Sequence, residues 1–457
     1  MTKTDAKSDR RYLWNLCMFT VSFVISNLVS GIIYDVYVNY LQEVGREVAV
    51  SFWSYYGYSA FISAALLLLI PKIGYKALLL FCAATCTAAI GAILFFDNTY
   101  LYALTTLLAL SGLQLHFAIL SPYIAAYTKK DNKINWYSRV YYIGYSGYFL
   151  TTFLGGMVTV KFFSMRGHIL YDEARKLTEY IEDMAPDIYN AYLQGNKDVL
   201  LLTGILSALA FIPVCLIKEQ RSDYQMTAPK EKIALSQKIS MYRRAIFNKY
   251  TMTYLIYWAM INFGMGLFTS YYTVFLNRNL HIDRATASFM VSFSYLALVL
   301  FMLFTPYIVK KIGQVNTLGG VSLLSIPFML IIANGDKFGA LMIPVVGFAL
   351  FMRSGLVNLS YPVDSSLSME IVDKQLRPIF ATVINVVAGL ASVVSGWFTG
   401  NILFVTQEGY RTAYYIAAVF YAVGCTLLLI GLRKFNWTLS EEKNNCLSEE
   451  ELLWRNF

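Results

Sequence analysis

A few ionisable side chains lie inside long apolar stretches of this sequence, and their types could support chemistry there. Arg353 lies at the middle of one stretch, His116 follows Gln114 by two positions in another, and Asp35 is the one carboxylate that we place within such a stretch. If these stretches cross a lipid bilayer, each charge costs about 2.5 kcal/mol or more at the bilayer centre. Each of these residues therefore needs a partner or a function.

Each of the three ionisable residues has a functional and a structural interpretation. A guanidinium binds anionic groups through paired, charge-assisted hydrogen bonds, so Arg353 either orients an anionic substrate or pairs with another helix. The charge of histidine changes near physiological pH, so His116 either binds substrate, relays protons or is an interhelical hydrogen-bond partner. Burial favours the neutral form of a carboxyl group, so Asp35 is either the carrier of a coupling proton or an interfacial acid in contact with water.

Tyrosine is used heavily, with 35 residues, many of them in clusters. An aromatic belt at the membrane interfaces accounts for many of these. A tyrosine ring also offers an apolar plane and one hydroxyl group, which suits amphipathic organic solutes. The predicted substrate-binding set consists of Arg353, His116, Gln114, Tyr34, Tyr145, Tyr272 and Asn358.

The composition indicates which kind of element must hold these residues. The chain has 457 residues, of which 57% are hydrophobic and 14% are charged, whereas soluble domains carry about 25% charged residues. This excludes a soluble enzyme, a nucleic-acid binder, a disulfide scaffold and a disordered chain. Five of the six cysteines fall in apolar stretches, where free cysteine behaves as a small hydrophobic residue. We expect no metal site and no cofactor.

The apolar stretches predict membrane-spanning helices. A span needs about 20 apolar residues, and we therefore expect an all-α membrane protein with twelve transmembrane helices. Four longer segments lie outside these helices: an N-terminal segment (1–11), an insert (164–198), a central loop (218–249) and a tail (434–457). The expected spans are 12–41, 51–70, 75–96, 99–128, 135–163, 199–217, 250–276, 285–308, 314–334, 338–362, 377–404 and 411–432.

The distribution of Lys and Arg predicts the orientation. With the N-terminus inside, the inner segments hold 26 basic and 14 acidic residues, and the outer segments hold 10 basic and 13 acidic residues. Cytoplasmic loops carry the excess of basic residues, so we expect both termini in the cytoplasm and the chain in the plasma or inner membrane. The net charge of +9 is then a topology signal, and we expect no nucleic-acid partner.

A weak internal repeat divides the chain into halves at 12–217 and 250–433. Residues 34–39 (YDVYVN) recur as 272–277 (YTVFLN), and the Lys-Ile-Gly of 72–74 recurs at 311–313, an offset of 238 or 239. Because each half has six helices, both enter the membrane in the same direction. This predicts two six-helix bundles related by a parallel pseudo-twofold axis, with the substrate site near the midplane between the copies.

These features resemble the major facilitator superfamily of secondary transporters over residues 12–433. The loop between the second and third helices keeps Gly74 and the basic residues of the family motif, with Pro71 in place of its acid. The fifth helix keeps the pair Gly155 and Gly156 of the antiporter motif without its proline. The resemblance implies a cavity lined by helices one, four, seven and ten, which would include His116 and Arg353.

The resemblance also implies a cytoplasmic gate, since similar transporters close the inner side with charged residues that recur in both halves. Solvated loop charge is the alternative. The predicted gate residues are Lys72, Asp131, Arg139, Lys311, Glu370 and Arg377.

The expected function is secondary active transport of a small organic, anionic solute by alternating access, coupled to a proton or another ion. We expect a monomer in the lipid bilayer that is not an enzyme. The alternative is an efflux antiporter for drugs or toxic compounds. A membrane-embedded transferase is disfavoured because His168 and Asp172 lie four residues apart, whereas the acyltransferase pattern needs five.

The insert is predicted to form an amphipathic helix over the outer mouth or on the outer leaflet, or to contact a partner protein. Its apolar residues recur at helical spacing up to Pro186. They are Leu170, Ala174, Leu177, Ile181 and Met184.

Overall fold

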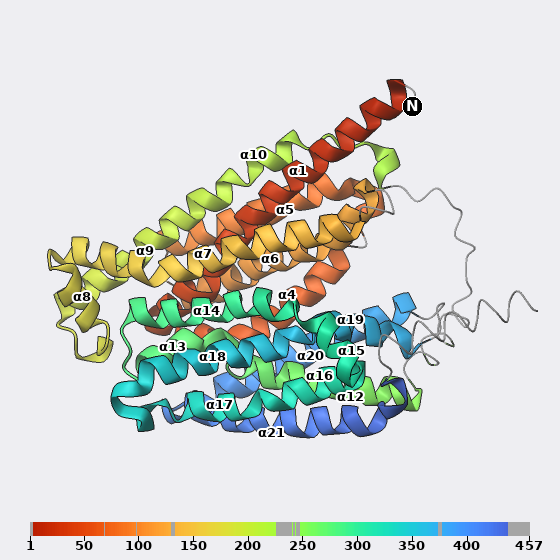
Figure 1. The fold of residues 1–457 in the computed structure, drawn as a ribbon. Coiled ribbons are helices and arrows are strands. Elements are labelled where there is room, and N and C mark those ends of the chain that lie inside the picture. Colours follow the sequence, from red (N-terminus) through yellow and green to blue (C-terminus); the bar gives the residue numbers. More distant parts are fainter. Residues whose placement is uncertain are drawn as a thin grey trace, which may run out of the picture. The chain divides into compact units, whose positions relative to one another are not determined.

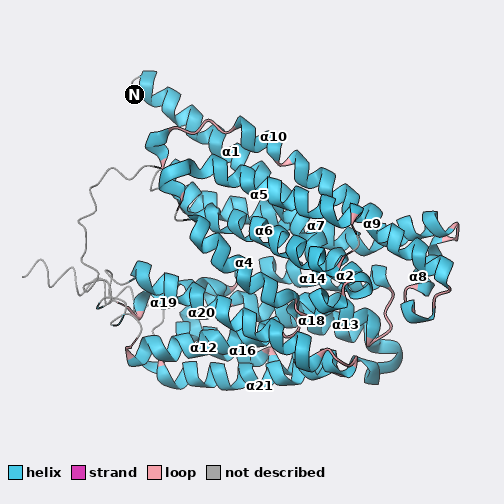
Figure 2. Cartoon of the chain, turned by 180° about the vertical axis from the view of Figure 1, so that it is seen from behind, coloured by secondary structure: helices cyan, strands magenta, loops and turns pink. Residues whose placement is uncertain are grey.

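A computed structural model describes residues 3–67, 69–96, 98–128, 133–224, 240, 243, 247–372 and 377–436. The described residues form helices and connecting turns without a β-strand (Figures 1 and 2). They divide into two compact units. Within the described residues, unit 1 comprises 3–224, 266–292 and 392–410, and unit 2 comprises 240, 243, 247–265, 293–372, 377–391 and 411–436.

Ten helical segments among the described residues are long and apolar enough to cross a membrane. They coincide with ten of the twelve expected spans, which confirms the all-α membrane fold. The expected span 51–70 corresponds to α4 (Phe52–Leu67), which has only 16 residues. The expected span 250–276 is divided between two helices. The helix α12 (Lys249–Gly266) ends within it, and the last residues of the expected span lie in the short α13 (Tyr272–Arg278).

Unit 1 contains the helices of the first half of the chain and segments of the second half. The helix α1 packs along α7, α5 packs on α6 and α9, and α7 also packs on α9. The first-half helices are α1 (Lys3–Ile32), the π-helical η1 (Ile33–Tyr37), α2 (Val38–Val44), α3 (Arg46–Val50), α4 (Phe52–Leu67), α5 (Ile70–Phe95), α6 (Thr99–Tyr127), α7 (Lys133–Gly167), α8 (Tyr171–Leu177), α9 (Pro186–Leu209) and α10 (Phe211–Leu216). The second half contributes α13, the start of α14 (Arg284–Met302), the end of α20 (Arg377–Phe398) and the π-helical η7 (Thr399–Leu403).

Unit 2 is built from second-half helices that proline residues divide into shorter pieces. A proline in the first turn begins α15, α17 and α19, where the missing N–H has no helical partner to lose. Besides α12 and the remaining parts of α14 and α20, the helices of unit 2 are α15 (Thr305–Ile312), α16 (Gln314–Leu324), α17 (Ile326–Ala333), α18 (Met342–Leu359), α19 (Tyr361–Glu370) and α21 (Glu408–Gly431).

The repeated Lys-Ile-Gly motif has the same backbone turn in each half. Gly74 and Gly313 both have φ +83°, a conformation that glycine adopts without strain. After Gly74, the Glu219 carboxylate accepts hydrogen bonds from the backbone N–H groups of Tyr75 (2.7 Å) and Lys76 (3.2 Å). After Gly313, the Asn436 side chain accepts one from the N–H of Asn316 (2.9 Å). The sequence repeat is therefore also a structural repeat at these positions.

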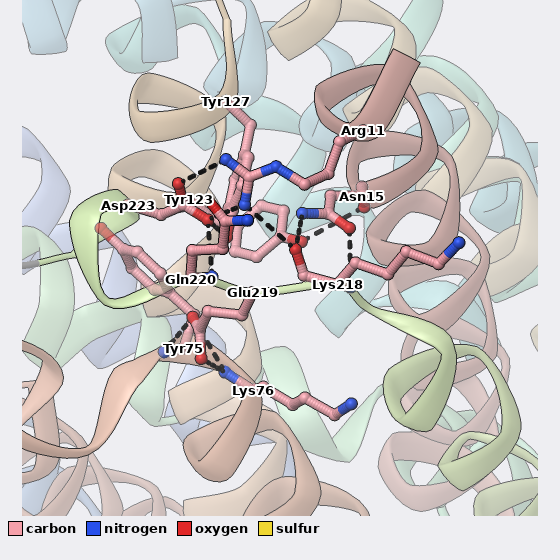
Figure 3. A network of polar contacts seen from close by, with 10 residues as sticks. All are labelled: Arg11, Asn15, Tyr75, Lys76, Tyr123, Tyr127, Lys218, Glu219, Gln220 and Asp223. Carbon is pink, nitrogen blue, oxygen red and sulfur yellow. Dashed lines mark hydrogen bonds and ion pairs between the residues drawn. The ribbon is translucent and has the colours of Figure 1, made fainter. Parts of the chain in front are cut away.

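The start of the central loop is fastened to unit 1 (Figure 3). The Arg11 guanidinium donates two hydrogen bonds to the Asp223 carboxylate, at 2.7 and 2.9 Å, and the Tyr127 hydroxyl donates a third at 3.1 Å. The Lys218 backbone N–H donates to the Asn15 side chain at 2.8 Å. Residues 218–224 thus lie at the same end of unit 1 as the start of α1.

The insert contains less helix than the sequence predicts. The helix α8 ends at Leu177, and only a short 3-10 turn at 181–183 follows before α9 begins at Pro186. Four of the five apolar residues of the insert face protein: Ala174 and Ile181 are buried in one cluster with Phe163 of α7, and Leu177 and Met184 pack against it. Leu170 is 78% exposed. We call the end of unit 1 that carries residues 168–185 the insert end.

Candidate functional site

A buried ion pair in unit 1 joins residues that lie far apart in the sequence. The Arg284 guanidinium donates to the Asp35 carboxylate at 2.7 Å, and the Ser288 hydroxyl donates to its other oxygen at 2.7 Å. The side chains of Arg284 and Asp35 are only 0% and 3% exposed. Asp35 is therefore not an interfacial acid in water, contrary to one of the two interpretations from the sequence.

The local backbone explains how these groups meet. Asp35 lies at the centre of the π-helical turn η1, and such turns occur frequently at functional sites. Arg284 and Ser288 are separated by one turn of α14, so their side chains lie on one face of the helix. The ion pair is thus held by two rigid helical segments.

The glycine pair of the fifth helix makes room for this cluster. A Cβ atom on Gly156 would lie 2.5 Å from the Arg284 backbone oxygen and 2.6 Å from the Ser288 hydroxyl oxygen. A Cβ atom on Gly155 would lie 3.2 Å from the Asp35 carboxylate. The two residues that resemble a family motif therefore permit the close approach of α7 to α14.

The Arg284 guanidinium retains hydrogen-bonding capacity. Its Nε and Nη1 atoms are buried and have no hydrogen-bond partner among the described residues. A buried donor without a partner costs about 1–3 kcal/mol. The cluster could therefore accept a polar or anionic group of a solute, or water, beside Asp35.

Further polar contacts connect α2, α13 and the insert at the insert end of unit 1. The Asn39 amide donates to the Thr273 hydroxyl at 2.8 Å, and Arg278 forms ion pairs with Glu43 and Glu182. These contacts link α2 to α13 and link both to the insert.

The insert also holds the residue that precedes α14. Arg175 pairs with Asp283 at 2.9 Å. Burial would raise the pKa of Asp283, but hydrogen bonds from Arg175 and Thr286 outweigh it, so the pKa lies below its ordinary value. The ion pair therefore stabilises the charged carboxylate at the start of α14.

Two of the predicted substrate-binding residues share a neighbour in unit 1. The Tyr34 ring lies 6.5 Å from the Tyr56 ring, and the Gln114 amide donates to the Tyr56 backbone oxygen at 3.0 Å. The Trp53 ring stacks on Tyr56 at 4.4 Å. Tyr34, Gln114 and Tyr56 are half-buried, so η1, α4 and α6 present an aromatic surface with an amide group.

The other predicted tyrosines lie elsewhere in unit 1. Tyr145 is stacked on Tyr141 with ring centroids 6.1 Å apart and lies 6.5 Å from Phe117. Tyr272 is buried in α13, with its ring 5.7 Å from that of Phe268.

His116 is placed in the core of unit 1. It is 3% exposed, and its ring lies 5.7 Å from Phe19 and 5.9 Å from Phe23. A cavity of about 20 Å³, lined by His116, Ser22 and Cys82 among others, lies beside it, which is enough space for one water molecule. The contacts of His116 thus differ from those of Tyr34 and Gln114.

Arg353 is buried in α18 of unit 2. It is 4% exposed and donates a hydrogen bond to the Tyr421 hydroxyl at 2.9 Å. Its guanidinium carbon lies 5.8 Å from the centre of the Tyr421 ring. Asn358, also predicted to bind substrate, donates to the backbone oxygen of Ser354 in its own helix at 2.8 Å.

The predicted gate residues are described only in part. Lys72, Arg139 and Lys311 are exposed, and Glu370 accepts a hydrogen bond from Gln314 at 2.7 Å. Asp131 and the side chain of Arg377 lie outside the described residues.

Sequence reasoning missed two ionisable residues. Arg284 was assigned to the outer segments because it lies at the edge of an expected span. Asp364 was assigned to the cytoplasmic segments, yet it is buried in α19, where its carboxylate accepts a hydrogen bond from Tyr254 at 2.7 Å. Arg284 could have been found from the sequence, because Arg284 and Ser288 lie four residues apart at the start of an apolar helix and therefore on one face of it.

Comparison with known proteins identifies the fold. No family model matches the sequence, and no curated protein sequence matches it. Solved structures match over most of the chain, as shown by the nucleoside transporter NupG, with a TM-score of 0.68 and 13% identity over 93% of this chain and 99% of that one. A bacterial homologue of the human lysosomal transporter Spinster, in an inward-facing and occupied conformation, has a TM-score of 0.67 and 12% identity over 93% and 98%. A D-xylose–proton symporter has a TM-score of 0.63 and 13% identity over 91% and 97%.

Each of these structures is named as a transporter or symporter, and each is covered almost completely. At 12–13% identity, the likeness establishes the architecture of the chain. This protein has the fold of the major facilitator superfamily of transporters.

Proposed function

We propose that this chain is a secondary transporter that moves a small organic solute across a membrane by alternating access. The observation that carries the proposal is the buried cluster of Asp35, Arg284 and Ser288 within the spanning helices of this fold. Burying an ion pair costs several kcal/mol per ion before pairing, so a purely structural role would be an expensive use of these residues. Similar folds are named for nucleosides, for D-xylose with a proton and for fucose with a proton, which supports solute transport coupled to an ion.

We assign the coupling role to Asp35. Protonation of its carboxylate would remove the charge that holds Arg284 and Ser288, and so weaken the contact between η1 and α14. A proton bound to Asp35 would thereby make the contacts at the insert end easier to break. An anionic group of the solute that competes with Asp35 for Arg284 would weaken the same contact between η1 and α14.

The proposed solute carries an apolar or aromatic part and an anionic group. Support for the first comes from the aromatic surface around Tyr34, Tyr56 and Gln114, and support for the second comes from the buried guanidinium of Arg353. The remaining proposed contacts are His116, Tyr145, Tyr272 and Asn358.

We further propose that the contacts at the insert end form an outer gate, and that the charged residues Lys72, Arg139, Lys311 and Glu370 act at the cytoplasmic end. Both termini would then lie in the cytoplasm, and the chain would act as a monomer in the cell membrane. Opening the outer gate requires the Asn39–Thr273 and Glu43–Arg278 contacts to break.

A ligand screen on purified protein tests the solute class. Thermal unfolding is measured with and without panels of anionic, neutral and cationic organic solutes, because a ligand that binds the native state stabilises it by mass action. Solutes that raise the unfolding temperature then enter uptake assays in proteoliposomes with an imposed pH gradient. Accumulation driven by the gradient supports coupled uptake, whereas a preference for cationic compounds and export against the gradient would favour a drug efflux antiporter.

Replacing Arg353 is expected to weaken binding of the solute found in that screen. Arg353→Ala removes the guanidinium, and Arg353→Lys keeps the charge without the planar fork that binds an anion through two hydrogen bonds. A lost hydrogen bond to a charged group costs about 1.5–3 kcal/mol, so we expect about a 10-fold to 100-fold rise in Kd for the alanine variant. Arg411→Lys is the matched control, because Arg411 forms a partly exposed pair with Asp336. Unchanged affinity in both Arg353 variants would assign Arg353 a structural role.

A further inference from the structure

Unit 2 contains a buried carboxylate whose environment differs from that of Asp35. Asp364 lies in α19, is 9% exposed, and accepts a hydrogen bond from the Tyr254 hydroxyl of α12 at 2.7 Å. Among the described residues no Lys, Arg or His lies within ion-pair distance of it. Asp35, by contrast, has both a guanidinium and a hydroxyl group as partners.

The groups around Asp364 are neutral or turned to other partners. The helix α12 supplies Tyr254 and Tyr257, and α19 itself supplies Ser368 beside Tyr254. Of the helices packed on α19, α15 has the exposed Lys310 and Lys311, α16 has Gln314, which donates to Glu370, and α18 has Arg353, which donates to Tyr421. The side chain of Arg377 in α20 lies outside the described residues.

This arrangement favours the protonated form of the carboxyl group. Removing a carboxylate from water without a cation nearby disfavours its charged form. Asp35, by contrast, has the Arg284 guanidinium 2.7 Å from its carboxylate.

We propose that Asp364 is a second proton-binding site of this chain, separate from Asp35, which takes up one proton at its carboxylate and releases it again. Tyr254 is the positioning residue, because its hydroxyl donates to the carboxylate. The role of this site in coupled transport rests on the proposed function, but proton binding itself can be measured without a solute.

The direction of the pKa supports the assignment. Asp364 lies beyond the end of the span Gly335–Leu359. Burial raises its pKa to about 7, and the hydrogen bond from Tyr254 opposes part of this rise. The native state therefore binds more protons than the unfolded state between the ordinary aspartate range and neutral pH, so stability falls as the pH rises through this window.

Infrared difference spectroscopy of the full chain in lipid nanodiscs, titrated with pH, tests the proposal directly. A protonated carboxyl group has a carbonyl stretching band that the carboxylate lacks. We expect this band to disappear with a midpoint near 7 and to be missing in Asp364→Asn. Tyr254→Phe should move the midpoint to higher pH, because the hydrogen bond that favours the carboxylate is lost. Asp35→Asn should keep the band, and so should Asp336→Asn, the control at an exposed acid.

The outcomes separate this site from the proposed transport function. A band that persists in Asp364→Asn, or a midpoint that does not move in Tyr254→Phe, would overturn the assignment, whatever the chain transports. If Asp364→Asn does not fold, the Tyr254→Phe shift decides the question alone. A titrating band in a chain that moves no solute would support the proton site and contradict the proposed function instead.

Discussion

Arg284→Met is expected to lower the free energy of unfolding by about 3–5 kcal/mol, because it leaves the Asp35 carboxylate buried without a cation. The methionine side chain occupies similar space but supplies no donor. The Ser288 hydroxyl remains as a partner within 2.7 Å, and one neutral hydrogen bond does not compensate a buried charge. Thermal or denaturant unfolding of purified protein measures the change.

The double variant separates lost charge compensation from lost packing. Asp35→Asn together with Arg284→Met removes both charges, so we expect it to recover most of the stability that the single Arg284 variant loses. Arg166→Met is the control, since its pair with Asp198 is exposed, and only a small effect is expected. Equal losses in the single and double Arg284 variants would show that the ion pair does not hold η1 to α14.

Gly156→Ala is expected to separate α7 from α14. The added methyl group would lie 2.5 Å from a backbone oxygen of α14, and backbone cannot turn away as a flexible side chain can. Overpacking of this kind costs about 1–3 kcal/mol, and the displaced helix should disturb the Asp35–Arg284 contact, with a large loss of uptake. Unfolding and uptake are measured on the same preparation.

A second glycine gives a matched control for this substitution. Gly91 lies in the helix α5 of the same unit, and a Cβ atom there meets nothing within 4 Å. Gly91→Ala should therefore be neutral or stabilise by about 0.5–1 kcal/mol through helix propensity. If Gly156→Ala and Gly91→Ala had the same stability and the same uptake, the close approach of the helices at Gly156 would not be required for function.

The parts of the fold that depend on local composition could be predicted from the sequence. Hydropathy located the spans, because a bilayer selects for length and apolar character along the chain. The repeat located Gly74 and Gly313, because a turn with positive φ selects for glycine in both halves. The glycine pair at 155 and 156 was also visible, although its contact with Asp35 and Arg284 was not.

The parts that depend on tertiary pairing could not be predicted. Asp35 appeared isolated because its partner Arg284 is 249 positions away and lies at the edge of a span, where basic residues are common. The burial of Asp364 was not expected because the apolar stretch ends near Pro362, whereas the chain starts a new helix there and places the acid against α12. The insert was expected to be one helix, but its contacts with Asp283 and Arg278 fix a shorter α8 and a turn.

Transport by alternating access requires the insert end of this chain to open, and a reversible cross-link between Asn39→Cys and Thr273→Cys tests this requirement most directly. The two native side chains meet at 2.8 Å, so the cysteines should cross-link efficiently in a background without native cysteines. Thr87→Cys with Ser207→Cys is the control, because this pair joins α5 and α9 within the first half at 3.1 Å. We expect the first cross-link to abolish uptake and reduction to restore it, while the control cross-link leaves uptake intact. Full uptake with residues 39 and 273 covalently joined would contradict the account.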